Sequence, residues 1–284
     1  MQNYFEIKKL KCSYERKKTN PKVVLEIEEL NIPRGEVVFI VGQSGCGKST
    51  ILETLGLMNN TILTAGKFMI TPEDNKEIDG TKVWDESNKT LSGIRKKYFS
   101  FIFQDTNLMR NFSIKENAEI SQQIKGGNKK YAETMRQTGL SQILDENKKD
   151  VGKLSGGQKQ RLAFVRAFMP NFRIIFGDEP TGNLDPDNAD NLIKIIRDEI
   201  QNTDKTAIIV SHSPELSVKY ADRIIKIHKQ ARKIIVAPKD KAKKEEEETY
   251  GLINSGSVYK KRNGQWFHNE NEITDEELTL KIKA

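Results

Sequence analysis

The stretch Gly42-Gln43-Ser44-Gly45-Cys46-Gly47-Lys48-Ser49-Thr50 matches the phosphate-binding pattern G-x-x-x-x-G-K-[ST]. The glycines of such a loop let backbone N–H groups converge on phosphate oxygens, and the following helix start adds a favourable dipole. In this pattern Lys48 reaches the β- and γ-phosphates, and the Ser49 hydroxyl is a ligand for Mg²⁺. The apolar run 37–41 predicts the preceding strand, and the spacing of residues 50–55 predicts the helix. We therefore predict a nucleoside triphosphate site.

Three further stretches carry chemistry at the ends of predicted elements. Leu154-Ser155-Gly156-Gly157-Gln158 precedes an amphipathic helix and forms a second helix start suited to phosphate. Asp178 ends the apolar strand 173–178 and Glu179 follows it, which favours two functional carboxylates over a surface turn. His212 follows the strand 207–210, and Gln104 ends the strand 98–103.

Together these motifs resemble those of the ABC ATPases, whose signature is L-S-G-G-Q, over residues 4–230. The resemblance implies that Asp178 holds Mg²⁺ and that Glu179 polarises the attacking water as general base. Gln104 matches the glutamine that senses Mg²⁺ and the lytic water, and His212 matches the switch histidine at the γ-phosphate. Asp185 matches the loop that crosses the dimer interface, and Tyr14 matches the aromatic residue that stacks on adenine.

The resemblance also implies a mechanism. ATP, bound with Mg²⁺, lies between the phosphate loop of one subunit and the Ser155 loop of a second, so that two ATP molecules sit in a C2-symmetric homodimer. Cys46 is then expected to be shielded by nucleotide. The run Glu179-Pro180-Thr181-Gly182-Asn183-Leu184-Asp185 is typical of the lipoprotein-release and macrolide-export branch, whose members work with membrane permeases.

Composition limits the remaining classes. The chain has 284 residues, 36% hydrophobic and 31% charged, and no apolar run approaches the roughly 18 residues of a membrane span. The N-terminus lacks signal-peptide features, and the two cysteines, Cys12 and Cys46, favour the cytosol. We expect a cytoplasmic protein, peripheral on the membrane, with a separate permease subunit.

The net charge of +7 fits polyphosphate, nucleic acid or an anionic membrane surface, and does not choose among them. The alternative function is therefore a soluble ABC-type ATPase that acts on nucleic acid or ribosomes. That class is usually marked by a long coiled-coil insertion or a second cassette, and neither is visible, so nucleic acid is not expected.

The alternation of strands and helices predicts an α/β fold with a P-loop NTPase parallel-sheet core. The strands 4–14 and 23–32 predict an antiparallel β layer, and the polar residues 71–80 predict a loop. Residues 113–144 read mostly as helix, broken at Gly126-Gly127 and Gly139. We expect an ABC ATPase domain at 1–236, with a helical subdomain at about 105–170.

The composition changes near Pro238. Residues 237–250 predict a charged linker or helix. Residues 251–284 predict a small C-terminal extension, in which Asn263-Gly264 favours a β-hairpin and Thr274 opens a short helix. A further protein partner for this tail is compatible with the sequence.

Overall fold

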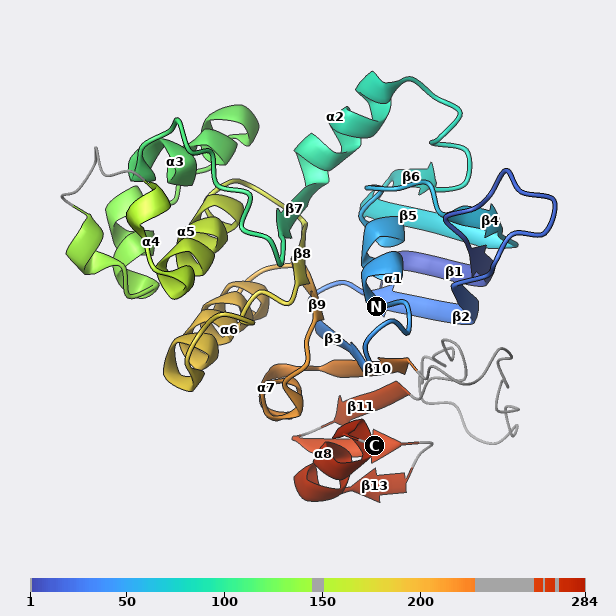
Figure 1. Cartoon of the computed structure of the whole chain (residues 1–284). Coiled ribbons are helices and arrows are strands. Elements are labelled where there is room, and N and C mark those ends of the chain that lie inside the picture. The colour runs from blue at the N-terminus through green and yellow to red at the C-terminus, as the bar shows by residue number, and fades with distance from the viewer. Residues whose placement is uncertain (1, 145–150, 228–257, 263, 269–270, 284) are drawn as a thin grey trace. The chain divides into compact units, whose positions relative to one another are not determined.

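The computed structural model describes residues 2–144, 151–227, 258–262, 264–268 and 271–283 (Figure 1). The chain divides into two compact units. The first contains Met1–Arg34, Val38–Leu91 and Ala221–Ala284, and the second contains Gly35–Val37 and Ser92–Tyr220. The expected linker at 237–250 lies outside the described residues. Within the described ranges, no helix has the length and apolar character needed to cross a membrane.

The first unit contains the predicted antiparallel layer. Its strands pair in the order β2-β1-β5-β6, with β4 also on β1. Their bounds are β1 (Asn3–Cys12), β2 (Leu25–Pro33), β4 (Ile62–Thr64), β5 (Lys67–Glu73) and β6 (Lys76–Asp79). The predicted loop at 71–80 is wrong, because β5 and β6 form a hairpin in which Met69 pairs with Asp79 and Ile70 with Ile78. Alternate residues of β5 are only partly buried, and those of β6 are exposed or partly buried, so these strands tolerate polar residues.

The first unit also contains the strand that leads into the phosphate loop. The strand β3 pairs in parallel with β10, and β10 continues through antiparallel β11, β12 and β13. The bounds are β3 (Val37–Gly42), α1 (Lys48–Leu55), β10 (Arg223–Ile227), β11 (Val258–Arg262), β12 (Gln265–His268), β13 (Asn271–Ile273) and α8 (Asp275–Lys283). The predicted hairpin is confirmed as β11–β12, in which Tyr259 pairs with His268. In Figure 1 these strands and α8 lie together beside β10.

The second unit contains three parallel strands, in the order β9-β8-β7, together with helices. Helix α2 (Asn88–Tyr98) carries the chain into it. The bounds are β7 (Phe99–Ile102), α3 (Ile114–Lys125), α4 (Tyr131–Gln137), α5 (Gly156–Phe168), β8 (Ile174–Asp178), α6 (Pro186–Gln201), β9 (Thr206–Val210) and α7 (Pro214–Tyr220), with 3₁₀ turns at Ser141–Ile143 and Val151–Lys153. The predicted helix breaks near Gly126 and Gly139 are confirmed. Buried Ile114, Met135, Leu140 and Leu162 form one core of this helical region.

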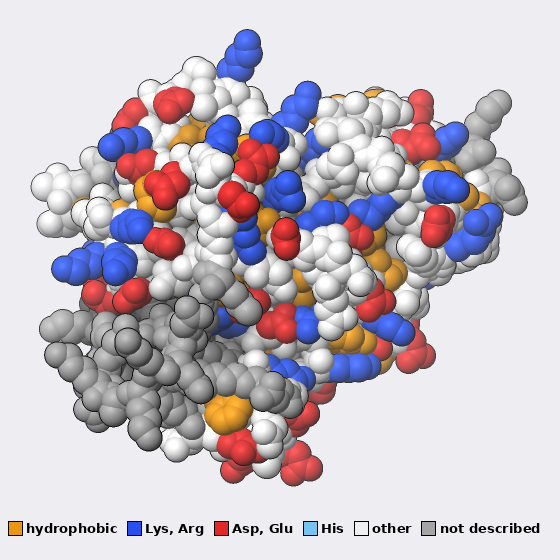
Figure 2. Space-filling model, turned by 180° about the vertical axis from the view of Figure 1, so that it is seen from behind, with side chains coloured by type: hydrophobic (Ala, Val, Ile, Leu, Met, Phe, Trp, Pro, Cys, Tyr) orange, Lys and Arg blue, Asp and Glu red, His pale blue; other side chains and the backbone are white. Residues whose placement is uncertain are grey.

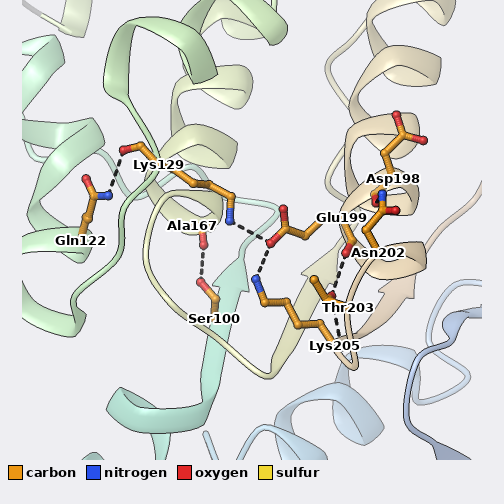
Figure 3. A network of polar contacts seen from close by, with 9 residues as sticks. All are labelled: Ser100, Gln122, Lys129, Ala167, Asp198, Glu199, Asn202, Thr203 and Lys205. Carbon is orange, nitrogen blue, oxygen red and sulfur yellow. Dashed lines mark hydrogen bonds and ion pairs between the residues drawn. The ribbon is translucent and has the colours of Figure 1, made fainter.

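A polar network joins the connector between α3 and α4 to the end of α6 (Figure 3). The Glu199 carboxylate accepts from the Lys129 ammonium at 2.9 Å and also from Lys205. Burial alone would raise the pKa of Glu199, but the two lysines lower it below its ordinary value. The two ammonium groups also lie over the Phe172 ring. This arrangement satisfies charges that are mostly withdrawn from water.

Asn117 fixes the segment that leads into α3. Its side chain is fully buried and accepts from the Met109 N–H at 2.8 Å. Its amide nitrogen lies 2.9–3.1 Å from the carbonyl oxygens of Met109, Phe112 and Ser113. One side chain therefore satisfies the backbone of a loop that would otherwise bury unpaired polar groups.

We expect Asn117→Asp to lower the free energy of unfolding by about 2–3 kcal/mol, because a carboxylate would face three carbonyl oxygens without a donor. The shift in the urea midpoint, followed by circular dichroism, measures it. Asn128→Asp, on the exposed connector, is the matched control and should stay within about 0.5 kcal/mol. Equal midpoints for the two variants would contradict the role given to Asn117.

Candidate functional site

The phosphate loop lies between β3 and α1 in the first unit. Lys48 is the first residue of α1, and its ammonium donates to the carbonyls of Gly42 at 2.9 Å and Gln43 at 3.0 Å. Gly47 has a φ of 106° and Gly45 a φ of 73°, which side-chain-bearing residues rarely adopt. Ser44, Gly45 and Ser49 are exposed. The Lys48 side chain therefore bonds to the backbone of its own loop, and the outer surface of the loop stays open to a phosphate group.

Gly42, the first residue of the loop, must be glycine because of its contact with β10. It pairs with Ile227 of β10, and a Cβ atom added to it would overlap the carbonyl oxygen of Ile227. The added Cβ would also lie 2.9 Å from the sulfur of Cys46. Cys46 is only 3% exposed, so its thiol is already shielded by the fold. The fold therefore already shields Cys46, and the expectation that nucleotide shields it stays a prediction.

Tyr14 is brought to the helix that follows the phosphate loop. Its hydroxyl lies 3.1 Å from the Thr50 hydroxyl and donates to the Glu53 carboxylate at 2.9 Å. Burial of the phenol, together with Glu53, raises the pKa of Tyr14. The side chain is nevertheless 55% exposed. The hydroxyl is thus anchored on α1 while much of the ring stays accessible, as a stacking residue requires.

The two predicted carboxylates lie at the end of β8 in the second unit, where Asp178 is the last residue of the strand and Glu179 follows it. Asp178 pairs with Val210 of β9, and the N–H of Glu179 donates to the Val210 carbonyl at 3.0 Å. Glu179 has a φ of 48°, in the left-handed region that costs energy for residues other than glycine. Its carboxylate lies 2.9 Å from Nε2 of His212. The structure therefore brings Glu179 and His212 together by forcing a tight turn at the strand end.

Gln104 lies at the same edge of these parallel strands. Ile102, the last residue of β7, pairs with Gly177, which immediately precedes Asp178. Gln104 follows two residues later and is exposed. The segment after it is held by Arg166, whose guanidinium donates to the carbonyls of Thr106 at 2.6 Å and Asn107 at 2.7 Å.

The Ser155 loop begins α5 in the same unit. The Ser155 hydroxyl accepts from the Gln158 N–H at 3.2 Å, and the Gln158 side chain accepts from the Ser155 N–H at 2.9 Å. This reciprocal capping box gives Gln158 a structural role that sequence reasoning missed. Gly156 is exposed, and a Cβ added there would meet nothing within 4 Å.

Asp185 caps α6. It accepts from the N–H of Asn188 at 3.0 Å and from its side chain at 2.6 Å, and these bonds lower the pKa of the carboxyl. Arg161 of α5 donates to the Asn188 side chain at 2.9 Å. Buried Gln160 donates to the carbonyl of Pro180 at 3.0 Å. Helix α5 is therefore bonded both to the turn after Glu179 and to the cap of α6.

Sequence reasoning missed Asn117, Gln160, Arg161 and Arg166. Each is a polar residue in a helix whose partners are backbone or side-chain oxygens, many of them distant in sequence. The only signal in the sequence is a large polar residue at a position where the helical period predicts burial, as for Gln160 beside Leu162 and Ala163.

Known families and proteins resemble this chain in sequence. The family model described as ABC transporter matches residues 25–182, more than half of the chain. The lipoprotein-releasing system ATP-binding protein LolD of Cereibacter sphaeroides is 32% identical over 76% of this chain and 92% of its own length. The macrolide export ATP-binding/permease protein MacB of Bradyrhizobium diazoefficiens is 34% identical over 70% of this chain, which spans only 29% of that relative.

Solved structures give the same result. The dimeric structure of MJ0796, a bacterial ABC transporter cassette, has a TM-score of 0.64 and 26% identity, and covers 79% of this chain and 94% of its own. A post-hydrolysis dimer of that cassette, bound to ADP and Pi, has a TM-score of 0.61 and 25% identity. The match covers 80% of this chain and 96% of the cassette. Fold, motifs and family model agree. The chain therefore belongs to the ABC transporter family, with the sequence and fold of its ATP-binding subunits.

Proposed function

We propose that this chain, an ATP-binding and ATP-hydrolysing subunit of an ABC transporter or mechanotransmission complex, dimerises around two ATP molecules and drives a separate membrane permease. The observation that carries the proposal is the geometry of Glu179. Its strained backbone, bonded to Val210, presents the carboxylate to His212 at 2.9 Å. A carboxylate held in this way is suited to polarise a water molecule in phosphoryl transfer.

The other residues take roles that their chemistry permits. Lys48 binds the β- and γ-phosphates, and His212 contacts the γ-phosphate. These two side chains therefore stabilise the negative charge that develops on the transferring phosphoryl group. Gln104 senses the metal and the lytic water at the exposed end of β7. Tyr14 stacks on adenine with its accessible ring.

The oxygen donors of Ser49, Asp178 and Gln104 fit Mg²⁺. Mg²⁺ prefers hydroxyl, carboxylate and carbonyl oxygen together with phosphate and water, and these side chains offer one hydroxyl, one carboxylate and one amide. The Ser49 hydroxyl is exposed on the first turn of α1. When bound, the ion neutralises charge on the transferring phosphoryl group.

A second copy of the chain completes each site in this proposal. The exposed Ser155 loop, with Gly156 and Gly157 at the start of α5, closes over the γ-phosphate held by the partner's phosphate loop. Asp185 lies near the dimer interface. The dimeric cassettes among the solved structures support this assembly.

The names of the relatives support a proposal for the partner and the location. LolD is named as the ATP-binding protein of a lipoprotein-releasing system, and MacB as an ATP-binding/permease protein. We propose that the permease of this chain is a separate protein and that the chain binds it peripherally, on the cytoplasmic face of the membrane. Residues 1–236 would form the ATPase domain, with a helical subdomain at about 105–170.

Nucleic acid is the less favoured partner. On the face drawn in Figure 2, Lys and Arg side chains are interspersed with Asp and Glu rather than gathered in one stripe. A nucleic-acid surface needs clustered cations along the phosphate backbone.

Replacement of Glu179 tests its proposed role as general base. We expect Glu179→Gln to lower kcat about 10²- to 10³-fold, because an amide cannot accept the proton of the attacking water. ATP binding should persist, so ATP should convert the variant into a long-lived dimer on size-exclusion chromatography. Asp187→Asn, exposed in the first turn of α6, is the matched control. An ATP-loaded Glu179→Gln protein that stays monomeric would refute the sandwich.

Mixing two inactive variants tests whether two chains share each site. Lys48→Ala and Ser155→Arg should each be inactive alone. Their mixed dimer has one intact site, formed by Lys48 of one chain and Ser155 of the other, so random mixing should restore about a quarter of wild-type activity. As control, Lys48→Ala is mixed with a chain carrying both changes, which provides no intact site. Failure of the first mixture to exceed the control would show that sites are not shared.

Isolation from membranes tests the proposed partner. The tagged Glu179→Gln chain, solubilised in mild detergent with ATP, should retain a membrane-spanning protein, identified by mass spectrometry. Recovery of RNA or ribosomal proteins instead, lost steeply as salt rises, would favour the nucleic-acid alternative.

A further inference from the structure

The C-terminal module, defined here as β11, β12, β13 and α8, adjoins the strand next to the phosphate loop. In β10, Ile224 pairs with Tyr259 of β11 on one side and with Phe39 of β3 on the other. The module is therefore separated from the strand that ends in Gly42 by β10 alone, as Figure 1 shows. All of these elements belong to the first unit.

Lys226 of β10 bonds directly to the module. The side chain is 6% exposed, and its ammonium donates to the backbone carbonyl of Lys281 in the last turn of α8. The last carbonyls of a helix have no partner within the helix and carry the negative end of its dipole. Helix α8 therefore supplies the acceptor for a cation that is otherwise withdrawn from water, which fixes the position of Lys226.

Helix α8 is itself fixed by the core of the module. Trp266 and Leu278 are fully buried, and Ile273 and Ile282 are nearly so. Leu280 of the same helix is 68% exposed. The carbonyl that receives Lys226 is therefore held by packed side chains on one face of α8, and the other face offers a leucine that can be changed without disturbing them.

Lys226 is coupled to the phosphate loop through the next residue, Ile227. Lys226 pairs with Val41, and Ile227 pairs with Gly42. The Ile227 carbonyl approaches Gly42 so closely that no Cβ atom could stand between them. Because this contact has no spare room, a displacement at Lys226 must move the first residue of the loop whose carbonyl accepts from Lys48.

We propose that the C-terminal module is a positioning element for the phosphate loop, acting through the bond between Lys226 and the Lys281 carbonyl. Lys226 is thus a positioning residue that sets the geometry of Gly42 without touching ATP. The proposal rests on the proposed function, since it takes this loop to be the ATP site.

The test compares three variants of the full chain. Lys226→Met keeps the volume and removes the ammonium, Leu278→Ala loosens α8, and Leu280→Ala is the control on the exposed face. For the first two we expect KM for ATP to rise about fivefold with kcat within about twofold, because the loop loses ground-state contacts to phosphate. We expect Leu280→Ala to match the wild type.

A second readout needs no nucleotide. Alkylation of Cys46, mapped by mass spectrometry, should quicken about fivefold or more in Lys226→Met and Leu278→Ala, because the buried thiol lies against Gly42. Buried Cys12 of β1 is the internal reference and should keep its rate. General loosening of the fold would expose both thiols and would overturn the proposal.

The proposal also falls if a folded Lys226→Met chain keeps wild-type KM and Cys46 reactivity. If that variant does not fold, Leu278→Ala decides by the same readouts. A wild-type chain that neither binds nor hydrolyses ATP would instead refute the proposed function, whereas active wild-type protein with unchanged variants refutes only the positioning role.

Discussion

The contact between the Ile227 carbonyl and Gly42 is the constraint on which the first unit depends. Because Gly42 has no side chain, β10 pairs with β3 to its last residue, and the phosphate loop begins where that pairing ends. The loop then folds back so that Lys48 bonds to the carbonyls of Gly42 and Gln43. The first glycine of the motif is thus fixed by strand packing, whereas Gly45 and Gly47 supply left-handed backbone within the loop.

A comparable constraint organises the second unit. Glu179 occupies a backbone conformation that is unfavourable for a side-chain-bearing residue, and its bond to Val210 offsets part of that cost. Gln160 also holds this turn, since its side chain donates to the Pro180 carbonyl. The strained backbone of Glu179 is therefore maintained by contacts among several elements, which fits the general-base role proposed for its carboxylate.

Sequence patterns predicted the features that depend on local chemistry. The phosphate loop, the helix breaks at Gly126 and Gly139 and the hairpin at Asn263-Gly264 each follow from residues adjacent in the chain. The polar stretch 71–80 was mispredicted as a loop, because strands that are only partly buried need few apolar residues. Asn117 and Arg166 were not predicted, because their partners are backbone carbonyls. Every residue has such a carbonyl, so the sequence does not indicate which one is used.

The docking of the C-terminal module could not be predicted either, because the β-ladder joins Arg223 to Lys260 across a long interval of chain. Its physical reason is visible in β10 itself. All five residues from Arg223 to Ile227 are buried, and three are isoleucine. Such a strand left at a sheet edge would expose unpaired backbone and apolar side chains, a known route to aggregation. Strand β11 pairs with that edge, so the module completes the sheet that carries the phosphate loop.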